Sequence, residues 1–240
     1  MKPISSSPLQ ENLDSSLELK ALPQSSHLFH HKELADLLKK GELPIGQALE
    51  LAKQLGLSLN ELTLRGPEVT NQVLEDMLHA CPNIQELDIS WCPNLTDAAL
   101  SKLPKDLKIL DLSYNKITNA AIDHLPQGLQ TLILIGCKNL TDTMINKLPS
   151  GLQNLDLSEC HLLTNAAIGL LPQGLISLDV SYTHITDEMI DTLPKCLRSL
   201  NLCGCRHLTG MTLNKLPKGL LHLSVCDCPN LIDIAIDRLP

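Results

Sequence analysis

The sequence is poor in aromatic residues, with one Phe, one Trp and two Tyr among 240 residues, or 2% of the chain. This small number of aromatic side chains excludes the aromatic-filled core of many β-sandwiches and β-barrels. Aliphatic side chains and cysteine must therefore fill the interior. Basic residues are also in the minority, with 19 Lys and Arg against 27 Asp and Glu and a formal net charge of −8. This balance argues against a nucleic acid partner, because binding to phosphates depends on basic side chains.

Long apolar runs are missing too. No run reaches the roughly 18 residues of a membrane-spanning helix, and the first twenty residues hold no apolar stretch of a secretory signal. We therefore expect a cytoplasmic protein with no membrane partner. Hydrophobic residues nevertheless make up 43% of the chain, which predicts a folded protein with a large core.

Motifs of common catalytic sites are absent as well. The chain contains no phosphate-binding glycine loop, no H-E-x-x-H, no G-x-S-x-G and no G-x-G-x-x-G motif. None of its nine histidines stands at a recognisable catalytic spacing from a cysteine or serine. We therefore expect no enzymatic activity, no metal and no cofactor.

What the chain does have is an internal repeat. Seven units with aliphatic residues at their first, fourth and sixth positions follow one another at spacings of 23, 22, 23, 23, 22 and 23 residues. An irregular eighth unit precedes them from Leu57. A period of this length predicts a solenoid in which each unit buries its leucines against its neighbours. The seven units begin at Ile84, Leu107, Leu129, Leu152, Leu175, Leu197 and Leu220.

Each unit divides into a strand and a short helix. Leu110 and Leu112 with Asp111 between them show the alternation of a half-buried strand. A threonine then offers a helix N-cap, and a Leu-Pro pair ends the helix, because proline disfavours helical geometry in the residue before it. We predict a right-handed α/β solenoid, a horseshoe with a parallel β-sheet on its concave face and short helices on its convex face. The expected N-caps are Thr96, Thr118, Thr141, Thr164, Thr186 and Thr209.

The ninth position of the unit holds most of the cysteines. We expect its side chains to turn inward and all nine cysteines to be reduced, because their count is odd and their spacing follows the repeat. An alternative concerns Cys203 and Cys226, which face outward from adjacent strands about 4.8 Å apart, near His222, as in a zinc site or redox pair. The ninth-position residues are Cys92, Asn115, Cys137, Cys160, Thr183, Cys205 and Cys228.

The segment from Cys81 to Asp97, C-P-N-I-Q-E-L-D-I-S-W-C-P-N-L-T-D, closely resembles the cysteine-containing leucine-rich repeats of F-box/leucine-rich-repeat proteins. The Leu-Pro-x-Gly-Leu junctions, as at 125–129, depart from that family and resemble leucine-rich-repeat effectors of bacteria that live in host cells. The first resemblance implies a substrate receptor in ubiquitin ligation, with a Skp adaptor or cullin as partner. The second implies a protein delivered into host cytosol.

These patterns divide the chain into three parts. Residues 1–27, rich in Ser and Pro, are expected to be a disordered tail or, in an effector, to hold a translocation signal. Residues 28–56 are expected to form a helical N-terminal cap over the first unit. A degenerate F-box is the alternative there, echoed by residues 32–34 and 37–38 but lacking its Pro-x-Glu opening and closing Trp. Residues 57–240 are expected to form a domain of about eight leucine-rich repeats.

The fifth position of the unit points outward on the concave face. Its four carboxylates form a negative stripe that favours a partner with a basic surface. Leu-Asp-Leu-Ser is also the usual strand sequence of this repeat subtype, so the stripe has a structural explanation as well. The four residues are Asp88, Asp111, Asp156 and Asp179.

The eighth position, at the concave rim, holds the one Trp and both Tyr of the chain. Aromatic residues dominate the energetics of protein interfaces, and exposed isoleucines on the same face add apolar area. We therefore predict that a protein partner binds here. The predicted anchors are Trp91, Ile109, Tyr114, Ile133, Ile135 and Tyr182.

Together these features predict a non-enzymatic module that binds a protein partner on its concave face. One alternative is a non-catalytic fragment of a larger ubiquitin-ligase-type effector enzyme whose catalytic domain lies beyond Pro240. Another is a structural array that associates with itself.

Overall fold

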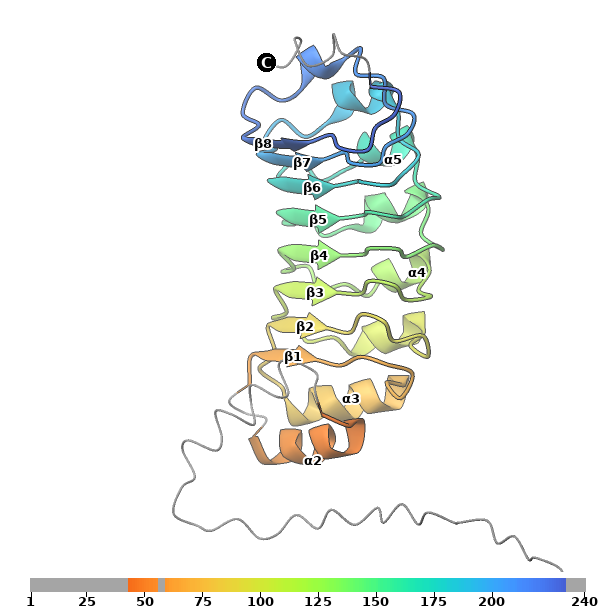
Figure 1. Cartoon of the computed structure of the whole chain (residues 1–240). Helices are drawn as coiled ribbons and strands as arrows, with labels where there is room; N and C mark the ends of the chain where they lie inside the picture. Colours follow the sequence, from red (N-terminus) through yellow and green to blue (C-terminus); the bar gives the residue numbers. More distant parts are fainter. Residues whose placement is uncertain (1–42, 56–58, 232–240) are drawn as a thin grey trace, which may run out of the picture.

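The computed structural model describes residues 43–55 and 59–231. Within these residues eight parallel strands form one open sheet in chain order, with short helices alternating along the chain. Figure 1 shows the strands stacked one above another, with the helices in a second stack beside them. The expected solenoid is confirmed. The strands are β1 (Glu61–Thr63), β2 (Glu86–Asp88), β3 (Ile109–Asp111), β4 (Thr131–Ile133), β5 (Asn154–Asp156), β6 (Ser177–Asp179), β7 (Ser199–Asn201) and β8 (His222–Ser224).

The register of the sheet places leucine beside leucine. The middle residue of every strand is a leucine, and it pairs with the middle leucine of the next strand from Leu62 through Leu223. All of these except Leu223 are buried. A shift by one residue would turn every leucine to the opposite face, so burial fixes the register.

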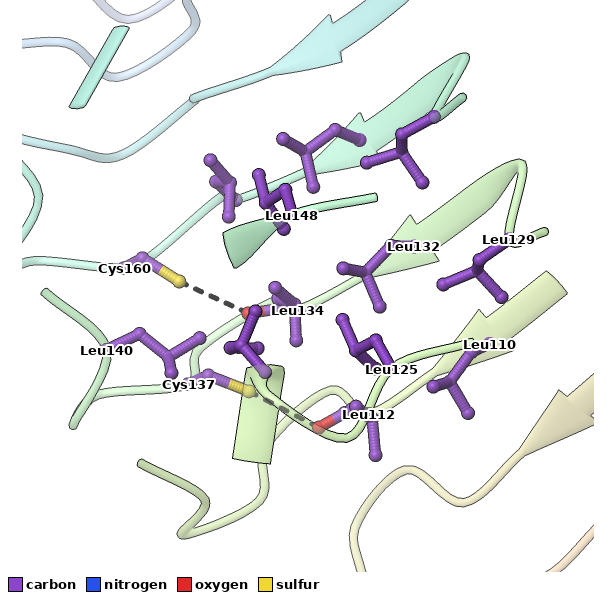
Figure 2. Close-up of a cluster of buried hydrophobic side chains, with 14 of the residues drawn as sticks. Leu110, Leu112, Leu125, Leu129, Leu132, Leu134, Cys137, Leu140, Leu148 and Cys160 are labelled. Carbon is purple, nitrogen blue, oxygen red and sulfur yellow. Dashed lines mark hydrogen bonds between the residues drawn. The ribbon is translucent and has the colours of Figure 1, made fainter. Parts of the chain in front are cut away.

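The core is a continuous stack of aliphatic side chains between the strands and the helices. In the central units, leucines from β3 and β4 meet Leu125 and Leu148, which lie just before the prolines that end two helical segments (Figure 2). Each unit contributes the same set of side chains, and the next unit covers them. The expected aliphatic core is confirmed.

The helical segments are short, and several are 3-10 turns rather than α-helix. Leu103, Leu148, Leu193 and Leu216 end their segments with ψ between 139° and 149°, as expected for a residue before proline. The segments are α2 (Ile45–Leu55), α3 (Asn71–Ala80), η2 (Asp97–Lys102), α4 (Asn119–Ile122), η3 (Asp142–Lys147), α5 (Asn165–Ile168), η4 (Asp187–Thr192) and η5 (Leu213–Lys215).

Five of the six predicted threonines stand at the N-cap of a helical segment. Thr118, Thr164 and Thr186 accept a hydrogen bond from a backbone N–H of the first turn, whereas Thr96 and Thr141 make no such bond. The prediction for Thr209 is wrong, because Thr212 is the N-cap of η5. The hydroxyl of Thr209 donates instead to Asp187 of the preceding unit.

A second role of these threonines links consecutive units. The Asn or Asp after each threonine accepts the backbone N–H of the threonine one unit later and also bonds its hydroxyl, at 2.5–3.0 Å. Amide and carboxylate do this equally well. We call this series the threonine ladder; it runs from Asn71 to Thr209 through Thr96, Asp97, Thr118, Asn119, Thr141, Asp142, Thr164, Asn165, Thr186 and Asp187.

The ninth-position side chains turn inward as predicted. Cys137 and Cys160 donate their S–H to backbone oxygens of the preceding unit, at 3.3 and 3.2 Å (Figure 2). Asn115 bonds three backbone groups of its own and the preceding unit in the same place. Burial raises the pKa of the Cys137 and Cys160 thiols to about 12, so they keep the proton that makes these bonds.

The cysteine prediction fails at one place. Cys203 and Cys226 form a disulfide between the ends of β7 and β8, with a Cα–Cα distance of 4.5 Å. The expectation that all nine cysteines are reduced is therefore wrong for this pair, because parallel pairing brings the seventh positions of adjacent units within bonding reach. The other seven cysteines of the described residues are free.

At the N-terminal end, α2 packs Ala48 and Ala52 into the core beside α3. The domain boundaries at 27 and 56 stay predictions. The expected tail, the residues that echo an F-box and the end of the last repeat lie outside the described residues.

Truncating a core leucine tests the packing. Leu157 is fully buried, so Leu157→Ala leaves a cavity and is expected to lower the free energy of unfolding by about 2–5 kcal/mol, measured by urea denaturation. The exposed Lys138→Ala serves as control and should change it by less than about 0.5 kcal/mol. Equal losses in the two variants would show that the leucine rows are not the core.

Candidate functional site

The outward face of the sheet carries the predicted apolar residues in its centre. Ile109 lies at the start of β3, Ile133 at the end of β4 and Ile135 two residues later. All three are half-buried, and Ile133 pairs in the sheet with Asp111 on one side and Asp156 on the other. The structure therefore brings the isoleucines and two of the four predicted carboxylates together.

The eighth position has a backbone conformation that sequence reasoning missed. From Trp91 to Asp227 this position has φ between 55° and 69°, the left-handed region that favours glycine. Gly136 and Gly204 adopt it without strain, whereas Trp, Tyr, Glu and Asp carry a cost there. Two glycines in the eighth position of the repeat are the sequence feature that could have indicated this backbone conformation. The eighth-position residues are Trp91, Tyr114, Gly136, Glu159, Tyr182, Gly204 and Asp227.

Both tyrosines lie across a glycine of the next unit. A Cβ on Gly136 would lie 2.6 Å from the ring of Tyr114, and one on Gly204 would lie 2.4 Å from the ring of Tyr182. The Tyr114 hydroxyl donates to Glu159 at 3.2 Å, two units away. Tyr182 repeats this arrangement with Asp227, at 3.3 Å. A Tyr–Gly–acid series thus occurs twice, and packing within the protein accounts for part of the aromatic column.

The rings also leave apolar area for a partner. Trp91 stacks on Tyr114 with ring centroids 4.1 Å apart, yet it remains 58% exposed. Tyr182 is 47% exposed. Tyr114 is half-buried between Trp91 and Gly136. The backbone N–H of Tyr114 donates to the Ile135 oxygen, so Tyr114 and the Trp91 ring stacked on it lie beside the isoleucines. Tyr182 lies two units beyond the unit of Ile133 and Ile135.

The four carboxylates of the fifth position share one structural task. In each, Oδ1 accepts the backbone N–H of the serine two residues later, at 2.8–2.9 Å, which closes the turn after the strand. Asn201 makes the same bond in its unit, so a negative charge is not needed for it. The four serines are Ser90, Ser113, Ser158 and Ser181.

The remaining charge is unequal along the stripe. Asp88 forms an ion pair with Arg65, and Asp179 accepts a hydrogen bond from Asn201. No ion pair of the described residues involves Asp111 or Asp156. Burial raises the pKa of both carboxyls, and neighbouring carboxylates raise it further. The two carboxylates that lack an ion-pair partner among the described residues therefore lie on both sides of Ile133, and each also accepts the hydroxyl of its own serine.

One further cluster escaped the sequence analysis. The exposed rings of His161, His184 and His207 form a line across three units, with successive centroids 5.7 Å apart. Among the described residues no three His, Cys, Asp or Glu side chains are placed to hold a metal ion. In the same part of the chain, no helix has the length and apolar character to cross a bilayer.

The fold and this face define a class. Stacked units of one strand and one short helix, with buried leucines in register, form a leucine-rich-repeat solenoid, a scaffold that typically binds proteins and is generally not catalytic. Residues 80–103 and 105–123 match the family model described as Leucine Rich repeat.

Among solved structures, the chain is similar to the leucine-rich repeat-containing protein LegL7 from Legionella pneumophila, with a TM-score of 0.51 and 16% sequence identity. The match covers 77% of this chain and 79% of that chain. At this identity the likeness concerns the fold alone. No curated protein matches the sequence. The cysteine-containing F-box subtype stays a prediction.

The tyrosine–glycine contact predicts a position-specific cost. Gly136→Ala is expected to lower the free energy of unfolding by about 1–3 kcal/mol, because the new Cβ meets the Tyr114 ring and the backbone is left-handed. Gly151→Ala, with nothing within 4 Å, is the control for urea denaturation. Adding Tyr114→Ala should remove the steric part of the Gly136→Ala cost. Strictly additive costs would show that the ring does not constrain Gly136.

The raised carboxyl pKa values predict a pH dependence. The folded chain binds the protons of Asp111 and Asp156 more tightly than the unfolded chain, so their contribution to stability falls as pH rises above about 4. Asp111→Asn/Asp156→Asn keeps the turn, as Asn201 does, and removes the charges. Urea denaturation from pH 4 to 7 should show the variant gaining on wild type as pH rises. A constant difference would contradict this electrostatic assignment.

Proposed function

We propose that this protein is a non-enzymatic interaction module whose concave face binds a protein segment with an apolar side chain next to basic ones. The observation that carries the proposal is the position of Ile133, a half-buried apolar residue on the outward face between Asp111 and Asp156, neither of which has an ion-pair partner among the described residues. Ile109 lies on the neighbouring strand and Ile135 two residues further along the same unit, and Trp91 extends the apolar surface by one more unit, where it stacks on Tyr114. We call the three isoleucines and Trp91, with Asp111 and Asp156, the central patch.

The apolar part of the central patch favours a protein partner over a small polar ligand. The core does not require isoleucine at 133 and 135, because the corresponding positions in four other units are Asp and Ser. Isoleucine there gives up the hydrogen bond that closes the turn in those units. Apolar area on an otherwise polar sheet gains free energy only when a partner covers it.

The charged part of the central patch favours a basic partner. Each carboxylate of Asp111 and Asp156 uses Oδ1 for its turn, and neither takes part in an ion pair of the described chain. Burial and, to a smaller extent, neighbouring carboxylates raise the pKa of both carboxyls, and a lysine or arginine of a partner placed beside Ile133 would favour their charged form. The net charge of −8 acts in the same direction on the rate of association.

The biological setting rests on resemblance. The segment from Cys81 to Asp97 resembles F-box/leucine-rich-repeat proteins, which supports a substrate receptor in ubiquitin ligation with a Skp adaptor or cullin. The Leu-Pro-x-Gly-Leu junctions, and the likeness in fold to a Legionella protein, support an effector that acts in the host cytosol. A non-catalytic part of a larger ligase-type effector enzyme is the second candidate, favoured by the same junctions.

A variant built from the protein's own consensus tests the proposal. Ile133→Asp/Ile135→Ser gives this unit the Asp-Leu-Ser sequence found elsewhere in the array, so it should fold, with only a small loss of stability from the added carboxylate between Asp111 and Asp156. Wild type and variant serve as baits in affinity capture from eukaryotic lysate with quantitative mass spectrometry. Partners of the central patch should be lost by the variant. If both baits capture the same proteins, the central patch is not the binding site.

The charge requirement is tested on a captured partner. Asp111→Asn/Asp156→Asn should weaken its binding at least about tenfold at low salt and much less at high salt, because screening removes long-range attraction. Isothermal titration measures both dissociation constants. If every bait retained a Skp adaptor or cullin, the binding site for the ubiquitin ligase would lie outside the central patch. Equal salt dependence in wild type and variant would overturn the basic-partner proposal.

A further inference from the structure

The seventh position changes character at the end of the array. Four earlier units have serine there, whereas the last two have Cys203 and Cys226. These cysteines follow β7 and β8, which pair directly, and the structure joins them by a disulfide that spans 23 residues of sequence. The bond links the last repeat covalently to the one before it.

The threonine ladder stops at the same place. Each unit from Asn71 onward uses an Asn or Asp side chain to hold the threonine of the next unit, and the last such contact joins Asp187 to Thr209. The residue that would continue the series is Gly210, which has no side chain. The disulfide therefore lies between the two units that the threonine ladder does not connect.

We propose that Cys203 and Cys226 form a reversible redox site, which exchanges with a low-molecular-weight disulfide such as oxidised glutathione and controls how firmly the last repeat is attached. The attachment that remains on reduction includes the pairing of β7 with β8 and the S–H of Cys228 on the Leu202 oxygen, at 3.2 Å. Two side chains also bond backbone oxygens across this junction, Asn230 to Arg206 at 2.6 Å and Arg198 to Gly219 at 2.8 Å. Among the described strands β8 pairs with β7 alone, and a strand paired on one side opens more readily than one paired on both.

The exposure of the two sulfurs sets the order of the exchange. Cys226 is exposed, whereas Cys203 is only 7% exposed. The Cys226 thiolate attacks one sulfur of oxidised glutathione, which forms a mixed disulfide and releases one glutathione thiolate. Cys203 then loses its proton and attacks the Cys226 sulfur, and the second glutathione leaves as thiolate. Two protein thiols are oxidised, one glutathione disulfide is reduced, and the reverse sequence opens the bond.

The neighbouring thiols do not compete for this chemistry. Cys205 and Cys228 belong to the inward ninth position, and both donate their S–H to backbone oxygens. Burial raises the pKa of Cys205 to about 11, so little of the reactive thiolate is present at neutral pH. Exchange is therefore directed to the outward pair.

Opening the bond also affects the concave rim. Asp227 follows Cys226 directly and accepts the hydrogen bond of the Tyr182 hydroxyl at 3.3 Å. The backbone N–H of Cys226 donates to the Cys203 sulfur at 3.1 Å. Loosening the last repeat thus frees the outer edge of the Tyr182 ring, while the central patch lies several units away.

Hydrogen exchange of the full chain with mass spectrometry tests the site. The protein carries Cys196→Ser, because this exposed thiol would itself form a mixed disulfide with glutathione. It is equilibrated at a series of ratios of reduced to oxidised glutathione, and alkylation after denaturation counts six free thiols in the oxidised form and eight in the reduced form. Reduction should speed exchange at least about tenfold in residues 220–231 and leave residues 84–196 unchanged. A bond that no ratio opens, or exchange that reduction does not change, would overturn the proposal.

Two variants separate redox control from a general effect of cysteine. Cys203→Ser/Cys226→Ser installs the residue found in the other units, and it should exchange like the reduced protein at every glutathione ratio. Ser158→Cys/Ser181→Cys places the same pair between β5 and β6, where Asn165 and Thr186 continue the threonine ladder. Both positions are buried, so this disulfide is formed by oxidative refolding before the comparison, and it should change local exchange less than about twofold. If the two disulfides changed local hydrogen exchange equally, the end of the threonine ladder would not explain the effect of the Cys203–Cys226 bond.

Discussion

The structure depends on hydrogen bonding between consecutive units. A three-residue strand and a single helical turn have no stability of their own, so each unit must satisfy its polar groups and cover its leucines with the next one. Three series of contacts do this at different depths: strand pairing on the sheet, cysteine or asparagine inside, and the threonine ladder beside the helices. Units of both lengths keep one strand register. In one short unit Asn115 bonds the preceding unit, as the cysteines do in longer units, whereas in the other Thr183 bonds the Val180 oxygen of its own unit.

This constraint separates positions that the fold needs from positions that are free to vary. Leucine at the fourth position is invariant across the eight strands, whereas the outward third, fifth and seventh positions vary. Even these positions are not wholly free, since Asp and Ser at the fifth and seventh close the turn. Departures such as Ile133 and Ile135 therefore give up a local hydrogen bond. Their apolar surface is the strongest indication of a partner on this face.

The sequence predicts the fold well because a period of 22 or 23 residues repeats seven times, and each repeat restates the same burial pattern. It predicts the inward cysteines for the same reason. It does not predict the left-handed eighth position, because Trp91 and Tyr182 are residues that usually avoid that conformation. Only Gly136 and Gly204, taken as members of the same column, would have indicated it. The disulfide was missed because the odd count of cysteines describes the whole chain, whereas bonding depends on which two strand ends are adjacent.

The two described ends of the array depart from the repeat at the same place, the seventh position. In the first unit, Arg65 takes the place of serine; it pairs with Asp88 and donates to the Ser90 hydroxyl at 3.2 Å. In the last, Cys226 is bonded to Cys203. An ionic contact and a covalent one thus join the terminal units at the point where the chain leaves each strand. Because screening weakens the first and reduction opens the second, the two ends respond to different conditions, while the central units keep one arrangement.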